Sequence, residues 1–353
     1  MRLIILKPVK LGVIGTGVGA TFAAEGISLF ASEGLVEIVA VADVYEEGAK
    51  RFCEKWKVKK WYKDYREMIE KEDLDAISIH TPHYLHYPMT MYALQAGKHV
   101  LVDKPIAINL KEADEMIEEA DRRRLNLGVI LPTRFDPVAR KVKEAADTGK
   151  FGKLALAEAL VKWYRDVDYY AKSSWRGRWD TEGGGALINQ AIHMIDLMRW
   201  VMGPVDYLWA QIDTVGHDIE VEDVAAATLR FKNGAIGIIE GGTALYPGLP
   251  PKFEIHGVKG MAIIEGGILR KWVIEGEEEI TEEGVKEGLK SWVRPDVVPA
   301  ANHGELIKDF IKSIIEDRKP YVDGVEGRDS LEIIRAIYKS ARTGRVVQFP
   351  VEE

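Results

Sequence analysis

Residues 10–43 read KLGVIGTGVGATFAAEGISLFASEGLVEIVAVAD, and this stretch decides the fold class of the first part of the chain. An apolar strand is expected over 10–14, a helix of small and apolar residues over about 18–32, and a second apolar strand over 36–42. A glycine-rich turn joins the first strand to the helix, and Asp43 ends the second strand. This order predicts a βαβ unit with a dinucleotide site at the glycine-rich turn.

The glycine-rich turn contains four residues that we expect to hold the cofactor: Gly15, Thr16, Gly17 and Val18. Gly15 permits a tight turn, and Gly17 lacks the Cβ atom that would keep a pyrophosphate away from the backbone. The helix that begins there offers free N–H groups and a partial positive charge to phosphates. Together with the flanking strands, the turn predicts an N-terminal Rossmann domain.

Asp43 indicates which dinucleotide would bind. It lies 23 residues past Ala20, near the offset at which a carboxylate accepts a hydrogen bond from a ribose 2′-hydroxyl. The same carboxylate would repel a 2′-phosphate. We therefore expect NAD as the cofactor, and we expect NADP to bind less well.

Length and composition limit the possible classes of protein. A chain of 353 residues exceeds one typical hydrophobic core, so two domains are expected. The net charge of −8 argues against nucleic acids and anionic membranes as partners. Cys53 is the single cysteine, which excludes an internal disulfide and fits a reducing cytoplasm. The apolar run at 3–6 is too short for a secretory signal, and no run is long enough for a membrane span.

The first third of the chain alternates strands and helices, which predicts a doubly wound parallel sheet. Four further strands are expected, at 60–62, 75–80, 99–102 and 127–131. The alternation ends after residue 131. We therefore expect a dinucleotide-binding domain over 1–131 and a domain for substrate binding and oligomerisation over 132–353.

The second domain is predicted to be α+β with a large, mostly antiparallel sheet. Asn233-Gly234 lies between the apolar runs 225–231 and 235–240, which is a strong hairpin signal. The few helices of this domain are enough to cover only one face of such a sheet. Because the other face would be apolar, we expect a homodimer or homotetramer.

Two more polar clusters lie at carboxyl ends of the predicted parallel strands, where ligands bind in open α/β sheets. One is Thr81-Pro82-His83 with His86, and the other contains Asp103 and Lys104. A lysine there can donate to a substrate hydroxyl and stabilise developing alkoxide charge, although a surface ion pair with the aspartate is the alternative. No metal site is expected, because the histidine spacings are irregular and no carboxylate triad accompanies them.

A helix predicted over 186–202, after three glycines, supplies the other candidates. Asn189 and His193 are four residues apart and share one face of a helix. Asp196 follows three residues later and could orient the imidazole. A buried histidine with a purely structural role is the alternative.

The chain resembles the family of glucose–fructose oxidoreductases, inositol dehydrogenases and related sugar dehydrogenases, known as the Gfo/Idh/MocA family. The resemblance spans nearly the whole chain. It is carried by motifs that occur in order and at a familiar spacing: the glycine-rich turn, Thr81-Pro82-His83 with His86, Ala96–Val100 leading to Asp103-Lys104-Pro105, and Gly183–Leu187 leading to His193.

The resemblance implies roles for particular residues. Lys104 matches the lysine of the family's Glu-Lys-Pro motif, and His193 matches the catalytic histidine. Asp103 replaces the usual glutamate. Asn189 stands where many members have aspartate, and an amide cannot accept a proton. The segment with Trp175 and Arg176 is similar to one that reaches toward the nicotinamide or the substrate, and Arg134 matches a position that faces the cleft.

We therefore expect an NAD-dependent dehydrogenase that moves a hydride between the nicotinamide and a secondary alcohol of a sugar, polyol or nucleotide-sugar. Two alternatives stay open on the same fold: a non-catalytic sensor of dinucleotides and an NAD-using glycosidase. The expected catalytic residues are Lys104, His193 and Asn189. The expected substrate-binding residues are Lys104, Arg134, Asn189 and His193. The expected cofactor-binding residues are Gly15, Thr16, Gly17, Val18, Asp43, Thr81, Pro82, His83, His86, Asp103, Lys104, Trp175 and Arg176.

Overall fold

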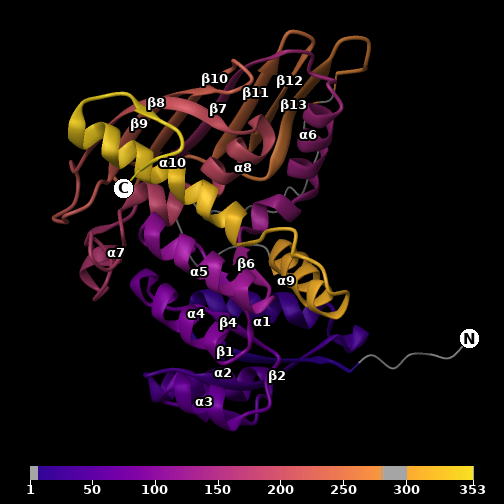
Figure 1. Ribbon diagram of the computed structural model, residues 1–353. Helices are drawn as coiled ribbons and strands as arrows, with labels where there is room; N and C mark the ends of the chain where they lie inside the picture. The colour runs from indigo at the N-terminus through magenta and orange to yellow at the C-terminus, as the bar shows by residue number, and fades with distance from the viewer. Residues whose placement is uncertain (1–6, 280, 282–299, 353) are drawn as a thin grey trace, which may run out of the picture. The chain divides into compact units, whose positions relative to one another are not determined.

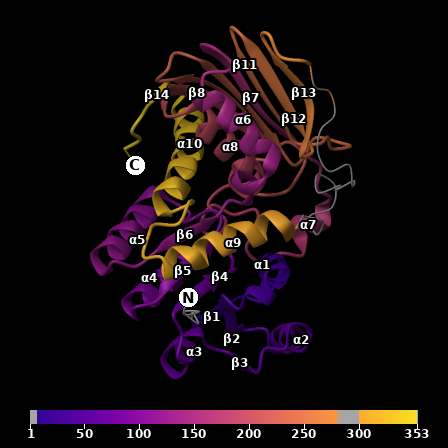
Figure 2. The same cartoon turned by 90° about the vertical axis from the view of Figure 1, so that its right-hand side faces the viewer.

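The computed structural model describes residues 7–279, 281 and 300–352. The chain forms two compact units (Figures 1 and 2). Unit 1 consists of Met1–Pro132 and Pro299–Arg328, and unit 2 of Thr133–Val298 and Asp329–Glu353. The apolar run at 3–6 lies outside the described residues. Among the helices that the structure describes, none is both long and apolar enough to cross a membrane.

Unit 1 contains a six-stranded sheet in the order β3-β2-β1-β4-β5-β6, and its neighbouring strands are parallel. The central strands are apolar and buried on both sides, as expected for a sheet with helices on its two faces. The predicted doubly wound sheet is therefore confirmed. Its strands are β1 (Val9–Ile14), β2 (Val36–Ala42), β3 (Lys60–Tyr62), β4 (Ala76–Ile79), β5 (His99–Asp103) and β6 (Leu127–Ile130).

Two of the helices between these strands begin at a residue whose side chain caps them. Asn109 accepts from the backbone N–H of Glu112 at the start of one helix, and Asp64 accepts from that of Arg66 at the start of another. The helix after the glycine-rich turn ends at Leu29, three residues before the predicted end. The helices are α1 (Val18–Leu29), α2 (Glu46–Trp56), α3 (Tyr65–Lys71), α4 (His86–Gln95) and α5 (Leu110–Arg123).

Helix α9 (Ala300–Ile315) packs in unit 1, although the sequence-based division places it in the second domain. The reason is a close approach between α9 and α1, which Figure 2 shows side by side. A Cβ atom on Gly26 would lie 2.6 Å from the backbone nitrogen of Gly304. Phe22 and His303 contact one another beside this point, with ring centroids 5.6 Å apart.

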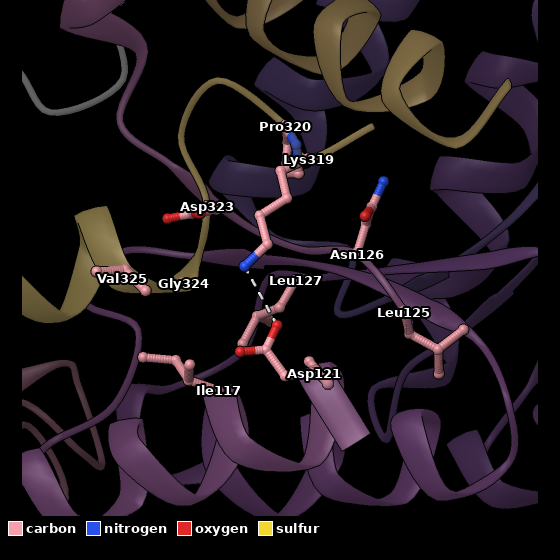
Figure 3. Close-up of a pocket in the computed structure, with 11 residues that line it drawn as sticks. Ile117, Asp121, Leu125, Asn126, Leu127, Lys319, Pro320, Asp323, Gly324 and Val325 are labelled. Carbon is pink, nitrogen blue, oxygen red and sulfur yellow. Dashed lines mark hydrogen bonds and ion pairs between the residues drawn. The ribbon is translucent and has the colours of Figure 1, made fainter. Parts of the chain in front are cut away.

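The segment after α9 continues the attachment to unit 1. The N–H of Val129 in β6 donates to the carbonyl of Val322 at 3.1 Å, so the segment covers the edge of the parallel sheet. Figure 3 shows Lys319 reaching across a small hollow to Asp121 at the end of α5, and the two form an ion pair of 3.2 Å. Residues 300–328 thus close the open side of the sheet at β6.

Unit 2 contains an eight-stranded sheet in the order β13-β12-β11-β7-β10-β9-β8-β14. Its neighbouring strands are antiparallel except β7 and β10, which pair in parallel, so the predicted mostly antiparallel sheet is confirmed. The Asn233-Gly234 hairpin joins β9 to β10 as expected. The strands are β7 (Leu154–Lys162), β8 (Val205–Asp213), β9 (Val224–Phe231), β10 (Ile236–Gly242), β11 (Lys252–Gly257), β12 (Gly260–Glu265), β13 (Ile268–Ile274) and β14 (Val347–Gln348).

Helices α6 and α8 lie against one face of the unit 2 sheet (Figure 1). Helix α6 contacts β12, and α8 contacts β7 and β11. No helix of the described residues lies on the other face (Figure 1). The elements are α6 (Pro137–Asp147), α7 (Val167–Ala171), a π-helical turn (Leu187–Ala191), α8 (Ile192–Met202) and α10 (Gly324–Thr343), which belongs to unit 2 from Asp329 onward.

We expect Gly26→Ala to destabilise unit 1. The added methyl group would meet backbone atoms of Gly304, which cannot rotate away as a side chain can, and such overpacking typically costs about 1–3 kcal/mol. Thermal unfolding followed by circular dichroism should show a decrease in Tm of about 3 °C or more. Ser28→Ala, an exposed change on the same helix, is the control and should leave Tm nearly unchanged. An unaltered Tm for Gly26→Ala would contradict the close packing of α1 on α9.

Candidate active site

Three loops meet at the carboxyl edge of the parallel sheet in unit 1. A Cβ atom on Gly15 would lie 2.3 Å from the carbonyl oxygen of His80, and one on Gly19 would lie 2.6 Å from the Asp103 carboxylate. The loop after β1 can therefore approach the loop after β4 because position 15 lacks a side chain, and Gly19 at the start of α1 leaves room for the Asp103 carboxylate. Gly15 also has a φ of +85°, which favours glycine.

The glycine-rich turn fits the pyrophosphate of a dinucleotide. A Cβ atom on Gly17 would meet no atom within 4 Å, so its backbone borders open space. Gly17 is also the residue that precedes the first turn of α1, and no side chain caps this turn. The first N–H groups of α1 are thus available to an anion, as the sequence predicts.

Asp43 is held against the glycine-rich turn by hydrogen bonds. One carboxylate oxygen accepts from both the backbone nitrogen and the hydroxyl of Thr16, each at 2.7 Å. The other oxygen accepts from the backbone nitrogen of Tyr45 at 2.8 Å. Each carboxylate oxygen has two lone pairs, so the second oxygen can accept one further hydrogen bond. The fixed carboxylate suits a ribose hydroxyl and opposes a phosphate.

His86 lies between two of the loops. Its ring nitrogens lie 2.7 Å from the carbonyl oxygen of Pro105 and 2.9 Å from that of Thr81, and the side chain is fully buried. Burial lowers the pKa of His86, because it disfavours the charged imidazole. His86 therefore positions the loops, and the structure gives no support to the direct cofactor contact expected from the sequence. His83 is also buried, while Thr81 and Pro82 are half-buried.

Asp103 holds the backbone of Lys104. The N–H of Lys104 donates to one carboxylate oxygen at 2.8 Å, and the imidazole of His80 lies 3.3 Å from the other. Burial opposes ionisation of Asp103, but the hydrogen bond and charge of His80 outweigh it and lower the pKa of the carboxyl. A negative charge on Asp103 is thus retained beside the lysine backbone, as its motif position suggests.

In unit 2 the three glycines pack against a buried carboxylate. The N–H groups of Gly185 and Leu187 donate to the two oxygens of Glu222, each at 2.8 Å, and the Tyr338 hydroxyl donates at 3.0 Å. A Cβ atom on Gly184 would lie 2.0 Å from that hydroxyl. Burial raises the pKa of Glu222 to about 7, against the effect of its hydrogen bonds. Glu222 thereby fixes the start of the helical segment that carries the predicted catalytic residues.

That segment begins with a π-helical turn, which the sequence did not predict. Leu187–Ala191 has π-helical hydrogen bonding, and α8 follows directly at Ile192. Asn189 lies in the π-helical turn and is 9% exposed, while His193 is in the first turn of α8 and half-buried. The Asn189 amide nitrogen donates to Glu182 at 2.5 Å. Such turns occur frequently at functional sites.

Trp175 and Arg176 lie beside Asn189 in the same unit. The guanidinium of Arg176 stacks on the ring of Tyr169 at 4.6 Å and on that of Trp175 at 4.7 Å. The Tyr169 hydroxyl in turn lies 3.4 Å from the Asn189 amide nitrogen. Unit 2 thus brings together the predicted residues Trp175, Arg176 and Asn189 around a tyrosine that the sequence did not single out.

Two expectations from the sequence need correction. Arg134 was expected to bind substrate, but it is 1% exposed and forms a two-pronged ion pair with Asp196, at 2.9 and 2.6 Å. Asp196 was expected to orient His193, but its carboxylate is held by Arg134 and by the Ser330 hydroxyl at 2.6 Å. Two buried opposite charges must pair with each other, because a buried charge without a partner costs free energy of folding. Both residues therefore belong to the core of unit 2.

Two buried glutamates, Glu182 and Glu222, are functional candidates that sequence reasoning missed. Each accepts a hydrogen bond from the backbone N–H of a glycine: Gly177 for Glu182 and Gly185 for Glu222. The signal available in the sequence was the carboxylate of Glu182 directly before Gly183-Gly184-Gly185.

Comparison with known proteins gives matches over both units. Residues 9–131 match a family model described as an oxidoreductase family with an NAD-binding Rossmann fold, and residues 139–263 match the GFO/IDH/MocA C-terminal domain. Myo-inositol 2-dehydrogenase of Thermotoga maritima is 29% identical over 350 residues, which cover 96% of this chain and 98% of that protein. The scyllo-inositol 2-dehydrogenase (NAD(+)) of Bacillus subtilis is 25% identical and covers 98% and 97%.

A solved structure supports the same relationship. The WlbA dehydrogenase from Bordetella pertussis, in complex with NADH and UDP-GlcNAcA, matches with a TM-score of 0.87 and 28% identity, over 98% of this chain and 100% of that chain. The two family models fall on the two sheets described above, one on each. The chain therefore belongs to the Gfo/Idh/MocA family of oxidoreductases, and its N-terminal domain is an NAD-binding Rossmann domain.

Proposed function

We propose that this protein oxidises a secondary hydroxyl of a sugar, polyol or nucleotide-sugar with NAD, or catalyses the reverse reduction. The observation that carries the proposal is the approach of Gly15 to the loop after β4 and of Gly19 to the Asp103 carboxylate, which accepts from the backbone N–H of Lys104. The substrate class is supported by the inositol dehydrogenases that the chain resembles and by the sugar nucleotide bound to the WlbA dehydrogenase.

Residues of unit 1 would hold the dinucleotide. The backbone of Gly15–Val18 would bind the pyrophosphate, Asp43 would accept from a ribose hydroxyl, and Thr81 and Pro82 would border the nicotinamide side. His83, His86 and Asp103 support these loops. Trp175 and Arg176 of unit 2 are proposed as further contacts to the cofactor. When bound, the nicotinamide supplies the hydride chemistry.

Three side chains are proposed to act on the substrate. His193 takes the hydroxyl proton as general base, since a neutral imidazole is a suitable acceptor near pH 7. Lys104 donates to the same oxygen and stabilises its negative charge as the proton leaves. Asn189 hydrogen-bonds a substrate hydroxyl and fixes its position. Membership in an oxidoreductase family favours this assignment over a non-catalytic sensor or an NAD-using glycosidase.

We expect NAD to bind at least about tenfold more tightly than NADP, because Asp43 is fixed where a 2′-phosphate would meet its negative charge. Asp43→Ser removes that repulsion and should narrow the difference. Isothermal calorimetry with each dinucleotide measures both affinities. Equal affinities for the unmodified protein would exclude this role for Asp43.

We expect Lys104→Met to lower the rate of alcohol oxidation by about a hundredfold or more, since losing one preorganised donor typically costs about 3 kcal/mol in the transition state. The affinity for NAD should stay within a few-fold.

For the unmodified protein the rate should rise with pH as the imidazole of His193 loses its proton and then level off. His193→Ala should abolish this rise together with most of the rate. A pH rise that persists in His193→Ala would make Lys104 the leading candidate for the base.

We also propose that the protein is a homo-oligomer that pairs through the face of the unit 2 sheet that α6 and α8 leave open. Apolar side chains alternate with polar ones on that face: Ile236 is 42% exposed and lies beside Leu156 of β7. Trp209 of β8 is 41% exposed on the same face. A second copy of the same face would cover these side chains.

Light scattering at micromolar concentration should give the mass of a dimer or tetramer. Ile236→Glu places a charge in the proposed interface and should shift the mass toward that of the monomer. Val258→Glu, at an exposed turn between β11 and β12, is the matched control and should not change the mass. A monomeric mass for the unmodified protein would refute the proposal.

A further inference from the structure

Asn189 is in direct contact with a buried carboxylate. Its amide nitrogen donates to Oε1 of Glu182 at 2.5 Å, and Glu182 is 1% exposed. The other oxygen of Glu182 accepts from the backbone nitrogen of Gly177 at 2.6 Å. Because Gly177 is a fixed backbone donor, the carboxylate is anchored and cannot turn away from Asn189.

This contact determines which way the amide of Asn189 faces. Both oxygens of Glu182 act as acceptors in these contacts, so Glu182 pairs with the NH2 group of the Asn189 amide and not with its carbonyl. The same nitrogen also lies 3.4 Å from the Tyr169 hydroxyl, which accepts from Gln190 at 2.7 Å. The carbonyl oxygen of Asn189 must then point away from Glu182.

We propose that Glu182 is a positioning residue that fixes the orientation of Asn189, so that Asn189 presents its carbonyl oxygen to a substrate hydroxyl as a hydrogen-bond acceptor. The part that concerns the substrate rests on the function proposed above. The orientation of the amide rests only on contacts within unit 2.

The proposal also gives a physical reason for asparagine at position 189. An aspartate there would place a second carboxylate about 2.5 Å from Glu182, and two carboxylates at such a distance hold one proton between them. Ionisable groups that interact electrostatically with Glu182 include Tyr169, Tyr170 and Tyr338.

A charge-swap series tests the orientation without substrate or cofactor. The variants are Glu182→Gln, Asn189→Asp and the double variant, with Glu220→Gln as an exposed control from the same unit. In Asn189→Asp the paired acids bind a proton more tightly when folded than when unfolded. At pH values between the pKa of these acids in the unfolded protein and the higher pKa of the pair in the folded protein, the folded state holds more protons. The free energy of unfolding must therefore fall as pH rises through that range.

Between pH 5 and pH 8 the Tm of Asn189→Asp should therefore decrease by about 5 °C more than that of the unmodified protein. In the double variant the introduced glutamine can donate its amide to the introduced aspartate, so the extra pH dependence should disappear. If the Tm of Asn189→Asp changes with pH only as much as that of the unmodified protein, the pairing is contradicted. If Asn189→Asp does not fold, a folded double variant supports the pairing and an unfolded one contradicts it.

Kinetics test the role toward substrate, with the fastest substrate from a panel of inositols, hexoses and sugar acids. In Glu182→Gln the N–H of Gly177 continues to donate to the carbonyl oxygen of the introduced glutamine, so the glutamine NH2 group faces Asn189. The Asn189 amide then rotates, so that its own carbonyl accepts from this NH2 group. KM should then rise about tenfold with kcat nearly unchanged, as expected when ground-state binding is lost. The double variant, which again offers an acceptor, should return KM to within about threefold.

An unchanged KM in Glu182→Gln would contradict the role toward substrate. If the unmodified protein oxidises no member of the panel and no nucleotide-sugar added to it, the proposed function fails and the role toward substrate fails with it. The unfolding series still decides the orientation of Asn189 in that case.

Discussion

The arrangement of the loops in unit 1 depends on two glycines, one packed against backbone and one against a carboxylate. Gly15 approaches the carbonyl of His80, and Gly19 approaches the carboxylate of Asp103. These contacts bring the first βα loop against the loops after β4 and β5, so a phosphate-binding turn and a strand-end lysine come to share one edge of the sheet. His86 lies between these loops, with its ring nitrogens close to the carbonyls of Pro105 and Thr81. The absence of Cβ atoms at Gly15 and Gly19 therefore allows these loops to approach one another.

Unit 2 holds several polar groups in its buried interior, where they need hydrogen-bond or charge partners. Glu222 and Glu182 each satisfy backbone N–H groups that the glycine segments leave without partners in helix or sheet. Burial alone disfavours such carboxylates, and the raised pKa of Glu222 reflects this. The hydrogen bonds offset that cost and fix the start of the segment that carries Asn189 and His193. Arg134 and Asp196 show the same principle as a closed ion pair.

Local patterns were sufficient to predict both sheets, the Asn233-Gly234 hairpin and the glycine-rich turn, because each depends on residues close together in sequence. The features that could not be predicted depend on contacts between distant residues. Helix α9 joins unit 1 through Gly26 and Gly304, and Arg134 meets Asp196 across 62 positions. The π-helical turn has no periodicity of its own to detect, and Glu182 looks like an ordinary polar residue until its two donors are placed around it.

The central claim is that hydrogen moves directly from a carbinol carbon to the bound nicotinamide. The most direct measurement is mass spectrometry of the reduced dinucleotide after incubation of the protein with NAD and inositols or hexoses deuterated at carbon. The account predicts a reduced dinucleotide one mass unit heavier than the unlabelled form. Conversion of a substrate with the reduced dinucleotide at its unlabelled mass, or with no reduced dinucleotide at all, would contradict it.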